Sequence, residues 1–97
     1  MIQNFKHQGV EDIFNNENTK EARKFLPSRL WRIAQRKLDQ LDSASTLNDL
    51  RMPPGNRLET LKGSRSGQYS IRINEQYRIC FYWLEHGPTD VEIVDYH

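Results

Sequence analysis

The sequence predicts an α+β fold in which a short strand and two helices precede a mainly antiparallel sheet. Two observations support this prediction. Hydrophobic residues recur at helical spacing in the first half of the chain and alternate with polar residues in the second half. The alternating segments are joined by turns that are too short for the crossovers of a parallel sheet. Because the chain has 97 residues, we expect one domain spanning residues 1–97.

The first elements are a strand and two helices. Residues 2–6 fit a short opening strand, and Val10, Ile13 and Phe14 then fall on one face of a short helix. After a polar, turn-rich stretch, a second helix is expected to begin near Pro27, since proline is tolerated in the first turn of a helix. The buried stripe of this helix comprises Leu30, Ile33, Ala34, Leu38 and Leu41.

A brief helical turn is expected over residues 47–50, before the sheet begins. Ser45 or Thr46 is placed to cap it, with Asp49 three residues after Thr46 in a weak version of the capping box. The following residues 52–56 contain two prolines and a glycine, which end the turn.

Alternation marks the strands from about residue 58 onward, and a turn over residues 85–88 precedes a last strand over residues 91–97. The core side of the two middle strands is expected to take Tyr69, Ile71 and Ile73 from one strand and Tyr77, Ile79, Phe81 and Trp83 from the next. Both sets can face the core only if an odd number of residues joins the strands, so we expect residues 74–76 to form the turn. Arg72 then lies directly opposite Arg78.

This pair of arginines is the first indication of a site. Like charges directly opposite each other destabilise a sheet unless something negative lies between them. A bound anion would resolve the conflict, and the alternative is that Glu59, Asp95 or solvent satisfies both guanidinium groups. Tyr82 is expected to share the arginine face, as is Cys80, which lacks a local partner and is expected to be a partly buried, inert thiol.

Positive charge is local rather than general. The whole chain carries 14 Lys and Arg against 13 Asp and Glu, a net charge of +1, which excludes a uniformly basic nucleic-acid coat. Residues 51–78 hold six basic residues against two acidic ones, and residues 20–37 hold seven against one. The first block suits RNA, where arginines pair with phosphates. The second fits RNA, an acidic partner or a solvated helix face.

Other classes of protein are excluded by what the sequence lacks. A single cysteine forms neither an internal disulfide nor, by itself, a zinc site. No apolar run approaches the roughly 20 residues that cross a bilayer, and the first residues lack the pattern of a signal peptide. We therefore expect a cytoplasmic protein that has no membrane partner.

The end of the chain carries groups suited to proton transfer. Asp95 and His97 share one face of the last strand, Tyr96 takes the other, and imidazole titrates near neutrality. We expect the face of Asp95 and His97 to be the one that holds Arg72 and Arg78. The alternative is that His97 is a mobile surface residue.

Three stretches carry a family resemblance. Residues 61–81 (LKGSRSGQYSIRINEQYRICF), together with the closing VDYH, resemble the HigB toxins of the RelE/ParE toxin-antitoxin superfamily. The PPGNRLE motif at residues 53–59 is most similar to the GraT-like subgroup. The resemblance implies a RelE-like fold and a toxin that cleaves messenger RNA in the ribosomal decoding site. It also implies metal-free transesterification by a ribose 2′-hydroxyl, without a cofactor.

Residue roles follow from the same resemblance. Lys62 and Arg78 would stabilise charge on the phosphate, and Asp95 and His97 would transfer protons. Tyr96 would orient RNA or a neighbouring group, and Arg65 and Arg72 would position the RNA backbone. Glu59 stands where some HigB proteins carry a histidine, so Asp95, His97 and Glu59 all remain candidates for the general base.

The resemblance further implies the partners. These are a HigA-type helix-turn-helix antitoxin, the ribosome and messenger RNA, with operator DNA bound only through the antitoxin complex. Two other functions stay open. One is a ParE-like inhibitor of DNA topoisomerase, which needs no catalytic residues, and the other is a ribosome- or RNA-binding protein that blocks translation without cutting.

Overall fold

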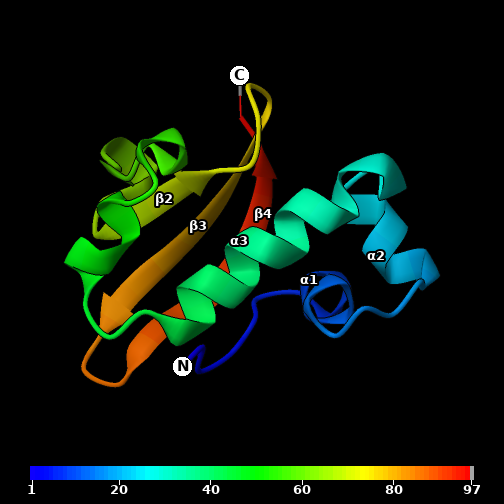
Figure 1. The fold of residues 1–97 in the computed structure, drawn as a ribbon, viewed down its shortest axis with the longest axis horizontal. Helices are drawn as coiled ribbons and strands as arrows, with labels where there is room; N and C mark the ends of the chain where they lie inside the picture. Colours follow the sequence, from blue (N-terminus) through cyan, green and yellow to red (C-terminus); the bar gives the residue numbers. More distant parts are fainter. Residues whose placement is uncertain (97) are drawn as a thin grey trace.

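A computed structural model describes residues 1–96 as a layer of helices packed on a four-stranded sheet (Figure 1). The helices are α1 (Gln8–Phe14), α2 (Lys20–Phe25) and α3 (Trp31–Ser43), with 3-10 turns η1 (Ser28–Leu30), η2 (Leu47–Arg51), η3 (Pro54–Asn56) and η4 (Gly63–Arg65). The strands are β1 (Glu59–Thr60), β2 (Gln68–Arg72), β3 (Tyr77–Leu84) and β4 (Gly87–Asp95). They stand in the order β1-β2-β3-β4, and all neighbours are antiparallel. The predicted α+β class with a mainly antiparallel sheet is confirmed.

The described chain contains three α-helices rather than the two that were predicted, because α2 was missed. Its N-cap is Thr19, whose Oγ1 accepts a hydrogen bond from the Ala22 amide at 3.0 Å. α1 approaches α2 closely through Gly9, where an added Cβ would lie 2.3 Å from the carbonyl oxygen of Glu21. Only Ala22 of α2 is fully buried, so the helix has no apolar stripe that the sequence could reveal.

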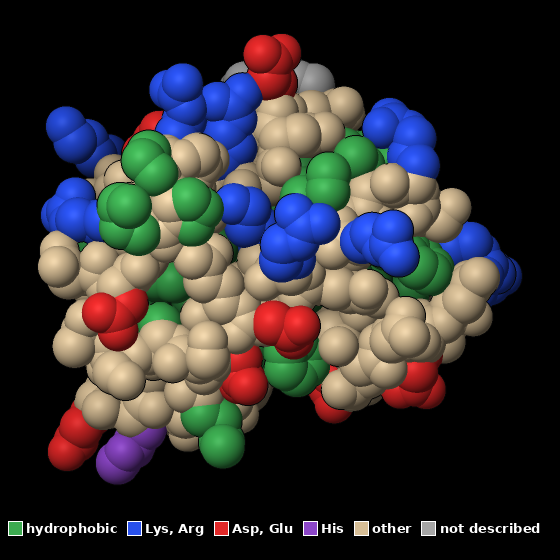
Figure 2. All heavy atoms as spheres, in the orientation of Figure 1, with side chains coloured by type: hydrophobic (Ala, Val, Ile, Leu, Met, Phe, Trp, Pro, Cys, Tyr) green, Lys and Arg blue, Asp and Glu red, His purple; other side chains and the backbone are tan. Residues whose placement is uncertain are grey.

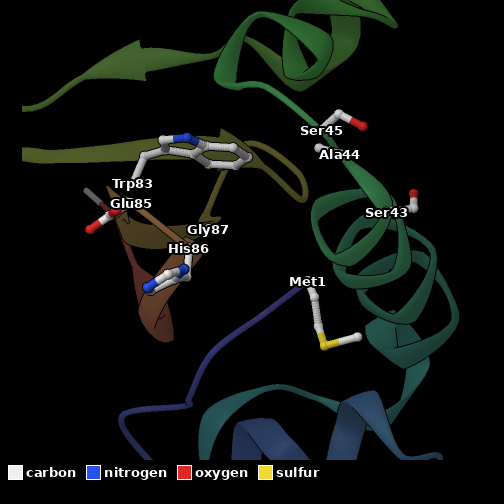
Figure 3. A pocket seen from close by; sticks show the side chains of 8 residues that line it. All are labelled: Met1, Ser43, Ala44, Ser45, Trp83, Glu85, His86 and Gly87. Atoms are coloured by element: carbon white, nitrogen blue, oxygen red, sulfur yellow. The ribbon is translucent and has the colours of Figure 1, made fainter.

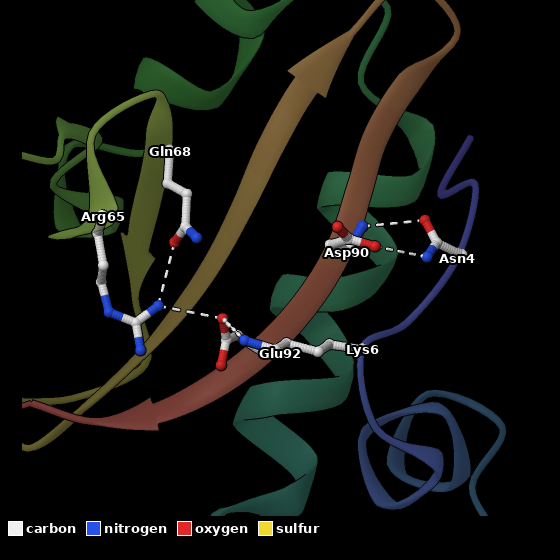
Figure 4. Close-up of polar contacts among 6 residues, drawn as sticks. All are labelled: Asn4, Lys6, Arg65, Gln68, Asp90 and Glu92. Atoms are coloured by element: carbon white, nitrogen blue, oxygen red, sulfur yellow. Dashed lines mark hydrogen bonds and ion pairs between the residues drawn. The ribbon is translucent and has the colours of Figure 1, made fainter.

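The opening strand is reduced to a single bridge. Residues 3–6 run beside β4, with the Gln3 amide donating to the Pro88 carbonyl at 2.8 Å and the Lys6 amide to the Val91 carbonyl at 2.9 Å. Phe5 and Val91 form the one isolated, parallel bridge among the described residues. The Asn4 side chain adds hydrogen bonds to Asp90 (Figure 4).

The central hairpin has the predicted register. Arg72 pairs with Arg78 and Ile71 with Ile79, so residues 74–76 form the turn. The capping box was also predicted correctly, since Thr46 and Asp49 cap each other's backbone at the start of η2. β4 begins at Gly87 instead of residue 91, so the turn before it is shorter than predicted.

Odd-numbered strand residues supply the core on the helix side. Ile71, Ile73, Ile79, Phe81, Val91 and Ile93 pack there against the stripe of α3 and against residues of α1 and α2. The other face of the sheet is polar, yet much of it is buried: Gln68, Ser70, Arg78 and Glu92 are all less than one-tenth exposed. None of the helices formed by residues 1–96 is long and apolar enough to cross a membrane.

Candidate active site

Arg78 lies at the centre of the polar face and is held on several sides. Its Nε donates to Ser70 Oγ at 2.7 Å and its Nη2 to the carbonyl oxygen of Arg57 at 2.5 Å. Nη1 lies 3.8 Å from a carboxylate oxygen of Glu59. The Arg78 side chain is only 8% exposed, so its position is fixed by these contacts before any ligand arrives.

Arg72, the cross-strand partner of Arg78, is satisfied separately. Its Nε donates to the Asn74 carbonyl at 3.0 Å, and Nη2 lies 3.7 Å from Glu75. Each arginine therefore faces a carboxylate of its own. Protein carboxylates therefore relieve the repulsion expected between the two arginines. Glu59 is the partner of Arg78, as the sequence allowed in place of a bound anion.

Tyr96 joins the same cluster. The Cζ atom of Arg78 lies 5.6 Å from the centre of the Tyr96 ring, which is the geometry of a cation–π contact. The Tyr96 amide donates to the Gln76 carbonyl at 2.6 Å, which anchors the chain just after β4. Tyr96 is 39% exposed, so its ring is available at the surface beside the buried guanidinium.

The expectation for Asp95 was wrong. Arg78 pairs with Val94, whereas Asp95 pairs with Tyr77, whose side chain packs against the core. Asp95 therefore lies on the opposite face of the sheet from Arg78. Its carboxylate accepts a hydrogen bond from Gln76 Nε2 at 3.2 Å. The sequence contained the information needed to place Asp95. Val91 and Ile93 are apolar and, like Asp95, are odd-numbered residues of the last strand, so all three are expected on the core side of the sheet.

His97 lies outside the described residues, so its predicted role stays a prediction. Lys62 is exposed and immediately precedes η4, in the connection between β1 and β2. It forms no ion pair with any residue from 1 to 96. The Glu59 side chain is half exposed at the rim of the cluster.

Arg65 reaches across the polar face to β4 (Figure 4). Its Nη1 donates to Gln68 Oε1 at 3.1 Å and to Glu92 Oε2 at 3.0 Å, and Lys6 Nζ lies 3.5 Å from the same carboxylate oxygen. Burial opposes the charge of Arg65, but the hydrogen bond and charge of Glu92 outweigh it and raise the pKa of the guanidinium. About one-third of the Arg65 side chain remains exposed to a ligand.

Cys80 lies deeper than the partly buried position that the sequence predicted. It is fully buried, and burial raises the pKa of its thiol to about 11, with the charge of Arg65 acting in the opposite direction. A protonated, inaccessible thiol is neither a nucleophile nor a metal ligand. Within residues 1–96, no three His, Cys, Asp or Glu side chains gather closely enough to hold a metal ion.

Two members of the cluster were missed in the sequence. Gln68 and Glu92 occupy even-numbered strand positions, as Arg78 does, and that parity was available to place them on the polar face. Ser70 falls on the polar face by the predicted alternation of its strand, but no role was predicted for it. The carbonyl of Arg57 was not foreseeable, because side-chain patterns say nothing about where an irregular loop directs its backbone.

A cavity of about 380 Å³ lies elsewhere, at the far end of β3 from Arg78 (Figure 3). It is lined by Met1, Ser43, Ala44, Ser45, Trp83, Glu85, His86 and Gly87. None of the residues with predicted roles contributes to it, so we do not assign it to the candidate active site.

The predicted basic block on the helices forms an exposed surface. In Figure 2, Lys and Arg side chains gather over α2 and α3. The exposed basic residues of this stretch are Lys20, Arg23, Lys24, Arg29, Arg32 and Arg36. Of these, Lys24 is the one that forms an ion pair with a described residue, Glu21.

Comparison with known proteins is consistent with these features. Residues 3–97 match the family model described as RelE-like toxin of type II toxin-antitoxin system HigB. The chain is 39% identical over 85 residues to Toxin HigB-1 of Vibrio cholerae serotype O1, covering 88% of this chain and 86% of that protein. It is 28% identical over 97 residues to Endoribonuclease HigB of Proteus vulgaris, covering 100% of both.

Proposed function

The chain belongs to the RelE-like HigB toxins of type II toxin-antitoxin systems, and on this premise we propose that it is an endoribonuclease that cuts messenger RNA on the ribosome. The resemblance seen in the sequence is confirmed at the level of the HigB family, while the GraT-like subgroup stays a prediction. An antitoxin partner follows from membership of the family. The relative from Proteus vulgaris is named as an endoribonuclease, which supports the same activity here.

The observation that carries the proposal is the fixed guanidinium of Arg78. Its contacts with Ser70, Arg57 and Glu59 hold it in a buried position beside the exposed ring of Tyr96. A preorganised cation stabilises the charge that develops on a phosphate in the transition state without reorganising at that moment. The ring next to it offers a surface on which an RNA base can stack.

The proposed reaction is a transesterification that needs no cofactor. The 2′-oxygen of a ribose attacks the adjacent phosphorus while the bond from phosphorus to the 5′-oxygen breaks, which leaves a 2′,3′-cyclic phosphate and a 5′-hydroxyl. One proton leaves the 2′-hydroxyl and one is delivered to the 5′-oxygen. Arg78 and Lys62 stabilise the phosphate, and Arg65 and Arg72 position the RNA backbone.

Proton transfer is assigned to groups around this cation. The Glu59 carboxylate lies 3.8 Å from Arg78 on the polar face, which favours it as a base over Asp95, which starts from the opposite face. Asp95 and His97 remain candidates for the proton transfers. Tyr96 orients the RNA or a neighbouring group.

We also propose the partners and location that the family suggests. The antitoxin is of the HigA helix-turn-helix type and reads operator DNA on behalf of the complex, while the toxin contacts the ribosome and messenger RNA. The exposed basic surface of α2 and α3 suits an acidic or mixed-charge antitoxin. Both molecules act in the cytoplasm.

Two non-cleaving functions compete with this proposal. A ParE-like topoisomerase inhibitor and a translation inhibitor that only binds the ribosome would each work without a preorganised phosphate site. Neither accounts for the burial of Arg78 among groups that fix its position.

Mapping of transcript 5′ ends in cells tests the proposal. Wild-type chain is expected to produce breaks in register with codons, and Arg78→Ala is expected to reduce them about 100- to 1000-fold, the usual loss for a preorganised donor. His97→Ala tests the group outside the described residues. Arg51→Ala is the matched control, because Arg51 is an exposed arginine on η2 whose Nε bonds to Asn48.

The outcomes separate the three functions. Growth arrest without breaks would favour one of the two non-cleaving functions, and inhibition of purified topoisomerase would identify the ParE-like one. Circular dichroism of each variant shows whether a lost activity reflects a lost fold.

A further inference from the structure

The loop that precedes β1 directs its backbone at Arg78. The carbonyl oxygen of Arg57 accepts a hydrogen bond from Arg78 Nη2 at 2.5 Å. Arg57 itself has φ 45° and ψ 57°, the left-handed conformation that residues other than glycine, asparagine and aspartate rarely adopt. Because φ and ψ set the direction of the carbonyl, this unusual conformation determines where the acceptor for Arg78 lies.

Asn56 holds the loop in that conformation. It is fully buried, and its Nδ2 donates to Gln40 Oε1 at 3.1 Å and to the carbonyls of Leu50 and Met52 at 3.1 and 3.2 Å. Lys37 Nζ donates to Asn56 Oδ1. One buried amide therefore ties the loop to α3 and to the end of η2.

Backbone hydrogen bonds within the short turn η3 also hold the loop in place. The Asn56 amide donates to the Pro53 carbonyl at 3.0 Å, and the Arg57 amide donates to the Pro54 carbonyl at 3.1 Å. Asn56 and Arg57 are thus both fixed by the turn, and Asn56 is also fixed by α3. Lys37 on α3 bonds to Asn56, the chain continues from Asn56 to Arg57, and the Arg57 carbonyl accepts the hydrogen bond from Arg78.

We propose that residues 53–57 are a positioning element for Arg78, in which buried Asn56 anchors the loop and left-handed Arg57 presents its carbonyl oxygen to the guanidinium. The element acts through Arg78 and touches no substrate. It rests on the role proposed above for Arg78 in phosphate stabilisation. Without it, Arg78 keeps its contacts with Ser70 and Glu59, but Nη2 loses its shortest hydrogen bond and retains the 3.5 Å contact with the Ser70 carbonyl.

A series of substitutions at Arg57 separates backbone geometry from side-chain charge. Glycine and asparagine accept the left-handed conformation, whereas alanine resists it and valine resists it more strongly, since β-branched residues rarely take positive φ. All four variants lack the Arg57 guanidinium equally, so Arg57→Gly and Arg57→Asn are matched controls for Arg57→Ala and Arg57→Val.

Cleavage of messenger RNA in a reconstituted ribosome complex gives the first readout. The single-turnover rate constant is expected to fall at least 10-fold from Arg57→Gly to Arg57→Val, with Arg57→Asn near the former and Arg57→Ala between them. The toxin concentration for half-maximal rate should stay within twofold, because positioning affects the transition state rather than binding. In an Arg78→Lys background the difference between glycine and valine should disappear.

Nitrogen NMR of the Arg78 side chain in the purified protein gives a readout that needs no RNA. The Nε–H signal is expected to keep its wild-type position in the glycine and asparagine variants and to shift or broaden in the valine variant. If folded glycine and valine variants show the same signal and the same cleavage rate, the positioning role is overturned. If the wild-type chain does not cut, the proposed function fails, while the NMR series still decides the geometry.

Discussion

Two charged residues of the polar face, Arg78 and Glu92, are buried. Arg78 and Glu92 are each less than one-tenth exposed, on the face of the sheet that the helices leave uncovered. Each is held by several partners, as a buried charge must be if it is to stay ionised. Arg78 and Glu92 are therefore a cation and an anion held in fixed positions on the same polar face.

Glu92→Gln is expected to loosen the η4 loop. The substitution keeps the shape of Glu92 but removes the charge that pairs with Arg65 and Lys6. Both cations are partly exposed, so water screens the pairs and the loss of unfolding free energy is expected to be about 1 kcal/mol. Urea unfolding monitored by tryptophan fluorescence measures it. Arg65→Ala and the double variant complete a cycle, and strict additivity would show that the Arg65 pair contributes nothing.

Cys80 is expected to resist alkylation in the native protein. The thiol is fully buried and its pKa is raised to about 11, so near neutral pH it is both inaccessible and protonated. Iodoacetamide labelling followed by mass spectrometry should show reaction only when denaturant opens the sheet. Fast labelling of folded protein would mean that the polar face is open in solution.

At the scale of elements, Asp12 joins α1 to the start of α2. Its carboxylate accepts from Thr19 Oγ1 at 2.6 Å and from Gln8 Nε2 at 2.9 Å, and these bonds, that of Thr19 first, lower its pKa. A lowered pKa stabilises the fold above the ordinary carboxyl value, about 3.9, and this contribution is lost as the pH falls through the folded-state pKa.

Asp12→Asn is therefore expected to be less stable than the wild type at neutral pH, with the difference shrinking as the pH falls below about 4. Thermal unfolding followed by circular dichroism across this range checks the sign. Asp39→Asn is the control, because Asp39 is an exposed carboxylate on α3. A gap that stays constant down to the lowest pH would contradict the linkage.

Some of these elements could be predicted from the sequence and others could not. The register of the central hairpin was predictable, because parity and two core-facing sets left one solution for Arg72 and Arg78. α2 was not, because a six-residue helix with one buried side chain leaves no periodic signal. The face of Asp95 was predictable from Val91 and Ile93 but was misassigned, because its chemistry was given more weight than its parity.

Within the site, side-chain patterns placed Arg78 on the polar face and named Glu59 as a possible partner, but they did not reveal the backbone contact that holds Arg78. The carbonyl of Arg57 and the buried amide of Asn56 act through an irregular loop, whose course depends on tertiary contacts with α3 and η2. Such contacts have no period in the sequence, so only the structure reveals them.

At the scale of the whole molecule, the isolated protein is expected to cut RNA poorly. Among residues 1–96 the site supplies a fixed cation, Arg78, beside two side chains that are 39% or more exposed, Tyr96 and Glu59, and such open groups hold a 2′-hydroxyl in line with the phosphate only weakly. Positioning of this kind accounts for many orders of magnitude in rate, and the ribosome is expected to provide it. Comparing cleavage of a short oligonucleotide with cleavage of the same sequence on programmed ribosomes measures the difference, and equal rates would indicate a free ribonuclease.

The pairing of residues 3–6 with β4 has a consequence for the timing of synthesis. Asn4 and Asp90 bond across 86 positions of sequence. At the usual 5 to 20 residues per second, about 4 to 17 s separate their production. The first residues therefore wait for a partner that the ribosome makes 86 residues later, and Tyr96 reaches Arg78 later still. A chain that stalls before β4 lacks both its sheet edge and its complete site, so unfinished copies of this toxin are expected to be harmless to the cell that makes them.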